Sequence, residues 1–155
     1  MRIKKIKISS GRVLVNYEKR SKSGLWDEYS FNCSEEPRPE LKEAMTALAP
    51  HVVDMCELPE EYLSKIEVKS VSFSYGGENA TMGATISGQM KLENSYCGLN
   101  LNTPHKASEM YNPSSEPDEM QLLTEECIDD LEVLCEEVKL FIDGERAQQR
   151  LFAVG

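Results

Sequence analysis

The sequence predicts a single α+β domain, residues 1–155, in which an antiparallel sheet of five or six strands carries an inserted helix and ends in a long acidic helix. Residues 2–32 and 66–103 alternate apolar and polar side chains, as strands do. Residues 41–55 and 127–142 repeat apolar side chains at spacings of three and four, as amphipathic helices do. With 40% hydrophobic and 28% charged residues, the chain has the composition of a globular domain.

The first three predicted strands form a meander. They cover residues 2–8, 12–18 and 26–32, and glycine-containing polar turns separate them. Apolar and aromatic side chains take alternate positions in the second strand, at Val13, Val15 and Tyr17. We therefore expect the meander to bury one face and to leave the other face in water.

A helix is predicted after the meander. Its apolar positions are Leu41, Met45, Leu48, Val52 and Met55. Pro50 lies inside this pattern, where a proline removes a backbone hydrogen bond and costs about 3 kcal/mol in a straight helix. We expect either a kink or two short helices that end near Leu58.

The clearest hairpin joins residues 66–75 to residues 80–92 through the turn Gly76-Gly77-Glu78-Asn79. Small and hydroxyl-bearing side chains fall on one face of both strands, so this face is predicted to be uncharged and rich in hydroxyls. The glycines within the second strand indicate close approach of another segment or of a ligand. A shorter strand, residues 98–103, is expected to extend the sheet.

Residues 106–118 are rich in serine, proline and charge and predict a loop. An acidic amphipathic helix is predicted over residues 119–144, with Thr124 as a candidate N-cap and Gly144 at its end. The heptad-like apolar stripe of this helix would permit a homodimer. The tail after it contains a small apolar patch, residues 151–154, that would dock on the domain or reach a partner.

Charge is divided between the two ends of the chain. The net charge is −10, and residues 116–143 alone hold eleven acidic side chains against the single Lys139. The first 24 residues hold eight basic side chains and only Glu18 on the acidic side. A basic start and an acidic finish predict a non-enzymatic binding protein that meets a protein partner through charged surfaces.

The basic meander suggests single-stranded nucleic acid as the alternative partner, because cations beside aromatic rings suit phosphates and stacked bases. The candidate residues are Lys4, Lys5, Lys7, Arg12, Tyr17, Lys19, Arg20 and Trp26. The order of three strands, a helix and two strands is also the order of an OB-fold. A structural interpretation competes, because lysines protect sheet edges and strand aromatics usually face the core.

The acidic helix supplies the candidate partner-binding residues. These are Glu125, Asp129, Glu132, Glu136 and Glu137. Three interpretations are open: a solvated outer face, which is the commonest, a helix that docks a partner, or a surface that imitates the phosphates of a nucleic acid.

No pattern in the sequence is specific enough to indicate a catalytic, metal or cofactor site. Cys97 and His105 could be assembled into a thiol nucleophile and its base, but their spacing does not support this. The hairpin lacks the glycine spacing of a phosphate loop, and two distant histidines make no zinc pattern. The sequence therefore predicts no enzyme, no cofactor and no metal.

Five widely spaced cysteines without a C-x-x-C pair predict reduced thiols, and no stretch approaches the ~20 apolar residues that span a bilayer. We therefore expect a cytoplasmic protein without a membrane segment.

Three stretches in the middle third of the chain carry a resemblance. They are Val71-Ser72-Phe73-Ser74-Tyr75, Met82-Gly83-Ala84-Thr85-Ile86-Ser87-Gly88 and Leu101-Asn102-Thr103-Pro104-His105-Lys106. In these stretches the chain resembles a group of small uncharacterised proteins encoded by bacterial phages and prophages. The resemblance implies a phage accessory protein in the host cytoplasm, and such proteins bind nucleic acid, host or defence proteins, or small signalling ligands. It implies no activity for any single residue.

Overall fold

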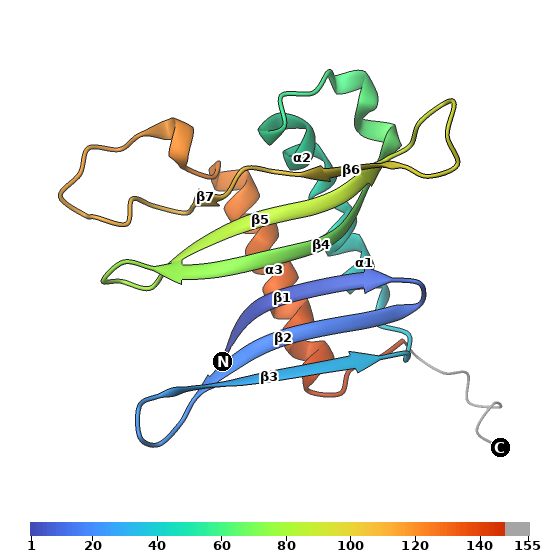
Figure 1. Ribbon diagram of the computed structural model, residues 1–155. Coiled ribbons are helices and arrows are strands. Elements are labelled where there is room, and N and C mark those ends of the chain that lie inside the picture. The colour runs from blue at the N-terminus through green and yellow to red at the C-terminus, as the bar shows by residue number, and fades with distance from the viewer. Residues whose placement is uncertain (148–155) are drawn as a thin grey trace, which may run out of the picture.

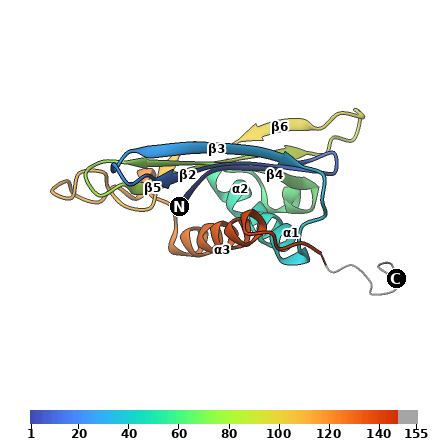
Figure 2. The same ribbon diagram turned by 90° about the horizontal axis from the view of Figure 1, so that it is seen from below.

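Seven strands form one antiparallel sheet, and three helices lie across one of its two faces (Figures 1 and 2). The strands are β1 (Arg2–Ser9), β2 (Arg12–Arg20), β3 (Trp26–Cys33), β4 (Ile66–Gly76), β5 (Thr81–Met90), β6 (Leu99–Asn102) and β7 (Lys106–Ala107). The helices are α1 (Pro39–Thr46), α2 (Ala49–Met55) and α3 (Glu125–Ile142), with short 3-10 helices at Glu60–Lys65 and Glu119–Gln121. This computed structural model describes residues 1–147, so the apolar tail patch predicted at residues 151–154 lies outside the described residues.

The strand order is β3-β2-β1-β4-β5-β6, with β7 paired to β5. The predicted meander and hairpin are both present, and they meet where β1 pairs with β4. Among the described strands the sheet is open, with β3 and β6 at its edges. The similarity to an OB-fold is therefore one of element order, and the α+β class with an antiparallel sheet is confirmed.

The predicted interruption at Pro50 is confirmed. Two short helices, α1 and α2, replace one long helix, and Pro50 lies in the first turn of α2. A proline is tolerated there because a backbone N–H in the first turn has no partner within its own helix.

The acidic helix starts later than predicted. The sequence pattern placed it over residues 119–144, but α3 begins at Glu125, where Thr124 Oγ1 accepts a hydrogen bond from the Cys127 amide at 3.1 Å. Asp118 caps a separate 3-10 turn by accepting from the Met120 amide, and Leu122 is extended. The predicted loop over residues 106–118 begins with the short strand β7, while Gly144, at φ +107°, follows the helix end as expected.

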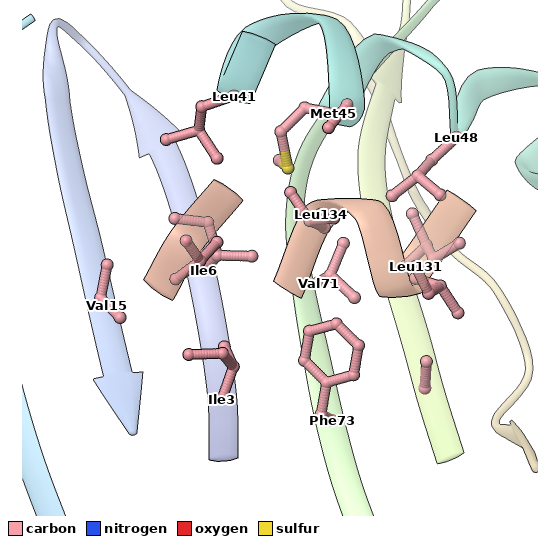
Figure 3. Packing of buried hydrophobic residues seen from close by; sticks show 14 of the residues in the cluster. Ile3, Ile6, Val15, Leu41, Met45, Leu48, Val71, Phe73, Leu131 and Leu134 are labelled. Atoms are coloured by element: carbon pink, nitrogen blue, oxygen red, sulfur yellow. The ribbon is translucent and has the colours of Figure 1, made fainter. Parts of the chain in front are cut away.

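The core lies between the sheet and the three helices. Figure 3 shows strand side chains such as Ile6, Val71 and Phe73 meeting Leu131 and Leu134 of α3. At the edge of this core, His51 Nε2 of α2 lies 2.6 Å from Asp130 Oδ2 of α3 and joins the two helices.

The five cysteines are free thiols, as predicted. Burial raises the pKa of the Cys127 thiol and of the Cys135 thiol to about 12, so both are neutral groups at the core. None of the helices described here is long and apolar enough to cross a membrane.

We expect Leu131→Ala to lower the free energy of unfolding by about 2–5 kcal/mol, because Leu131 is fully buried and its truncation leaves a cavity. The matched control is Val133→Ala on the same helix, whose side chain is 55% exposed and should cost no more than about 0.5 kcal/mol. Urea unfolding followed by circular dichroism measures both variants. Equal effects would contradict the packing of α3 on the sheet.

Candidate functional site

The face of the sheet opposite the helices (Figure 2) is here called the open face. The strand register places two rows of side chains across it. One row contains Ser30, Asn16, Lys5, Ser72 and Thr85. The other row contains Asn32, Leu14, Lys7, Ser70, Ser87 and Asn102. Neither row holds a carboxylate, although the chain has a net charge of −10.

A groove with a volume of about 530 Å³ is sunk into this face where β1, β4, β5 and β6 lie side by side. It is called the donor groove below. Its lining consists of Lys7, Ser9, Ser10, Lys69, Ser70, Ser87, Gly88, Gln89, Asn100, Leu101 and Asn102. The groove thus combines two lysines with hydroxyl and amide groups, and none of its lining residues is acidic.

Hydrogen bonds within the donor groove orient its two asparagines. Ser87 Oγ donates to Asn102 Oδ1 at 2.6 Å, and Gln89 Nε2 donates to Asn100 Oδ1 at 3.1 Å. In both asparagines the carbonyl oxygen is occupied, and the NH₂ group is the polar group that remains. The groove therefore offers the NH₂ groups of Asn100 and Asn102 as donors, while Ser87 Oγ and Gln89 Oε1 remain as acceptors.

A β-bulge in β4 builds the floor of the groove. The register of β4 against β5 shifts between Val68 and Ser70, which places Lys69 and Ser70 in succession at the groove. The bulged backbone comes so close to β5 that a Cβ at residue 88 would overlap the carbonyl oxygen of Glu67. Glycine at 88 is therefore required by a close backbone approach, which is one of the alternatives predicted for the hairpin glycines.

The predicted nucleic-acid residues divide between the two faces of the sheet. Lys5, Lys7 and Arg12 share the open face, where Arg12 Nε donates to Asn32 Oδ1 at 2.8 Å. Tyr17 packs on the helix side and stacks on Tyr29, with ring centroids 5.3 Å apart, and Lys19 Nζ lies 5.9 Å from the Tyr17 ring centroid.

Trp26 and Arg20 lie at the opposite end of the open face from the donor groove. The guanidinium carbon of Arg2 lies 3.9 Å from the Trp26 ring centroid, and Arg20 Nε donates to the carbonyl of Gly24. These contacts occupy the ring and the guanidinium with neighbours from the same chain.

Glu18 neutralises part of the basic meander. Its buried carboxylate forms ion pairs with the guanidinium of Arg2 and the ammonium of Lys4, and each N–O distance is 3.2 Å. Burial alone raises the pKa of Glu18, but the hydrogen bonds and charges of Lys4 and Arg2 outweigh burial and hold this pKa below its ordinary value. Lys4, a predicted nucleic-acid contact, is therefore committed to an internal ion pair.

The segment after β6 lies back over the β4–β5 hairpin. His105 Nε2 lies 2.7 Å from Ser74 Oγ, and the His105 ring stacks on Tyr111. A Cβ at residue 83 would come within 2.5 Å of His105 Nε2, so Gly83 makes room for this histidine. Cys97 instead lies in the β5–β6 connection, so His105 pairs with a serine on β4 and not with that thiol. The hydrogen bonds of the described residues give His105 no carboxylate partner, and the cluster anchors the segment.

The predicted acidic residues lie mostly on the outer face of α3. Glu125, Asp129, Glu132 and Glu136 are exposed and point away from the sheet. Glu137 is different, because its carboxylate is largely covered and lies 3.8 Å from Arg38. The anionic stripe and the open face are thus on opposite sides of the molecule (Figure 2).

Reasoning from sequence missed Arg2, Lys69, Asn100 and Asn102 as site residues. A local signal existed for the asparagines, because Asn100 and Asn102 alternate with Leu99 and Leu101 in a predicted strand. The bulge that exposes Lys69 left no comparable signal. No group of three or more histidine, cysteine or acidic side chains is placed to hold a metal ion within residues 1–147.

Comparison with protein-family models, with curated proteins and with solved structures finds no match to this chain. Fold and site together define it as an α+β protein with an open antiparallel sheet, one covered face and one polar, lysine-bearing face.

We expect Glu18→Gln to lower the free energy of unfolding at neutral pH by about 1–2 kcal/mol, because Arg2 and Lys4 lose their charge partner but keep some contact with water. The pKa of Glu18 is lowered in the folded state, so its contribution is present above the unfolded value of about 4.3 and is lost as the pH falls through the folded value. Urea unfolding of both proteins from pH 7 to pH 3 measures this. A constant difference over the whole range would contradict it.

Two glycine substitutions should differ in their effects. Gly88→Ala collides with backbone and should lower the free energy of unfolding by about 1–3 kcal/mol. Gly83→Ala meets only the side-chain ends of His105 and Ser74, so its cost should stay within about 1 kcal/mol while amide exchange over residues 104–111 becomes faster. Urea unfolding and hydrogen exchange test the pair, and unchanged exchange in Gly83→Ala would show that His105 is not the anchor.

Proposed function

We propose that this chain is a non-enzymatic binding protein that meets its partner through the open face of the sheet, as a phage accessory protein in the host cytoplasm. The observation that carries the proposal is the pair of cross-strand rows without a carboxylate in a strongly acidic protein. The three helices cover the other face, so the open face is the sheet surface left for a partner.

The character of this face favours a partner with anionic and polar groups. Lys5 and Lys7 lie next to hydroxyl and amide side chains, and neither lysine enters an ion pair with another described residue. Cations that have no ion-pair partner attract anionic partners and speed their association. A protein partner would bring acidic side chains to this face.

The outer face of α3 is the candidate for a second contact. Glu125, Asp129, Glu132 and Glu136 form an anionic stripe on the side of the molecule away from the open face. A basic surface on the same partner or on another one would be complementary to it. Glu137 is expected to stabilise the fold through Arg38 and not to take part in this contact.

Single-stranded nucleic acid is the second candidate, supported by Lys5, Lys7 and Arg12 on one face. Stacking of bases on aromatic rings has less support, because Tyr17 lies on the helix side and Arg2 lies over Trp26. Binding of a strand would therefore depend mainly on phosphate contacts and would fall steeply with salt.

We expect the double variant Lys5→Glu, Lys7→Glu to lose the partner that the wild-type protein captures by cross-linking in bacterial lysate, because the open face becomes anionic. The control is Lys22→Glu, which changes the same kind of charge in the exposed β2–β3 turn and should keep the partner. Capture that survives in the double variant but is lost in Glu132→Gln, Glu136→Gln would move the binding surface to α3.

The nucleic-acid alternative is decided by fluorescence anisotropy of a labelled ~20-nucleotide strand at low and at physiological salt. Binding that weakens with salt and disappears in the Lys5→Glu, Lys7→Glu variant would favour it. No binding at low salt would exclude it.

A further inference from the structure

We propose that the donor groove binds the phosphate group of a small ligand. This inference rests on the proposed function, in which the open face is the binding surface, and it names a ligand class for one end of that face. The donors that remain free, the placement of two lysines and the size of the groove support it.

Several hydrogen-bond donors of the groove have no partner within residues 1–147. Asn100 and Asn102 accept hydrogen bonds from Gln89 and Ser87, so their free groups are NH₂ donors. Ser70, on the floor, is only 8% exposed, and no other described residue is hydrogen-bonded to its hydroxyl. A ligand that only accepts hydrogen bonds and carries negative charge satisfies all of these groups, and a phosphate is such a ligand.

Two lysines are the only charged residues among those that line the groove. Lys7 lies directly opposite Ser70 in the register of β1 and β4, and Lys69 precedes Ser70 in the bulge, so two lysines and one hydroxyl-bearing residue line the same part of the groove. Lys69 Nζ is 3.0 Å from Glu67 Oε1, whereas no described carboxylate pairs with Lys7. Glu67 does not line the groove, so a phosphate there would meet Lys7 as its main counter-charge.

The size of the groove and the spread of its donors over several strands also fit a phosphate group. A volume of about 530 Å³ is that of a small-molecule site. The donors come from β4, from β6 and from the turn after β1, so three different segments line the groove. The oxygens of a tetrahedral phosphate can meet such a set, whereas the two coplanar oxygens of a carboxylate meet only part of it.

The test is an NMR titration of the full-length ¹⁵N-labelled protein with inorganic phosphate, adenosine monophosphate, adenosine, and sodium chloride at matched ionic strength. We expect phosphate and adenosine monophosphate to shift the signals of Ser70, Ser87, Asn100 and Asn102 to saturation, with dissociation constants in the millimolar range or below. Adenosine and sodium chloride should leave these signals in place. Equal affinity for the two phosphates would identify the phosphate alone as the recognised group, and tighter binding of the nucleotide would add its nucleoside.

Two substitutions of matched chemistry test the site itself. Asn102→Asp keeps the oxygen that accepts from Ser87 but replaces the NH₂ donor by a charged acceptor, so phosphate binding should weaken at least roughly tenfold. Asn32→Asp adds the same charge at the other end of the row and keeps the oxygen that accepts from Arg12, so binding should stay within roughly twofold. Lys7→Gln, which removes no described side-chain contact, should weaken binding like Asn102→Asp.

Shifts of the same size with sodium chloride, or unchanged affinity in Asn102→Asp, would overturn the phosphate site. These failures differ from failure of the proposed function. If partner capture still depends on Lys5 and Lys7 while phosphate does not bind, only the proposal of a phosphate site in the donor groove is wrong. If capture does not depend on those lysines, the open face is not the partner surface, whatever the titration gives.

Discussion

The pairing of β1 with β4 is the constraint on which the rest of the structure depends. It consists of three residue pairs, Lys5 with Ser72, Ile6 with Val71 and Lys7 with Ser70. The middle pair is fully buried beneath α3, and burial of such apolar side chains is what holds two strands together in a particular register. Because this short ladder joins the meander to the hairpin, it makes one continuous sheet from two units that are separate in sequence.

The same ladder creates the candidate site. When Ile6 and Val71 face the helices, their neighbours Lys7 and Ser70 must face the opposite side, because side chains alternate along a strand. A lysine from the basic meander is thereby placed beside the hydroxyl row of the hairpin. The bulge at Lys69 and the glycine at 88 then bring a second cation to the same place.

The separation of the acidic surface from the open face follows from the arrangement of the helices and the sheet in two layers. The helices lie on one side of the sheet, so the acidic outer residues of α3 lie on the side of the molecule away from the open face. Within the basic meander, Glu18 is buried in ion pairs with Arg2 and Lys4, so its charge is neutralised, while Glu28 opposite it on β3 is exposed at the end of the face away from the donor groove. An acidic protein can in this way keep one surface suited to anions.

Several features of the structure were determined by the sequence alone, because each depends on near neighbours in the chain. Among them are the alternation of side chains between the two faces along β2 and β5, the helix break at Pro50, and the N-cap at Thr124. The alternation had already grouped Tyr17 with Val13 and Val15, so its position on the helix side was available before the fold was known. The range 119–144 placed the start of this helix too early, although Thr124 was correctly predicted as its N-cap, because residues 119–121 form a separate 3-10 turn capped by Asp118.

Only the tertiary structure decided which strand lies beside β1, and with it the convergence of Lys7, Lys69 and Asn102. No local pattern encodes that neighbour, since pairing of distant strands depends on how their apolar faces pack together under the helices. The contacts of His105 with Ser74 and of Arg2 with Trp26 were likewise set by packing between segments that are far apart in the chain.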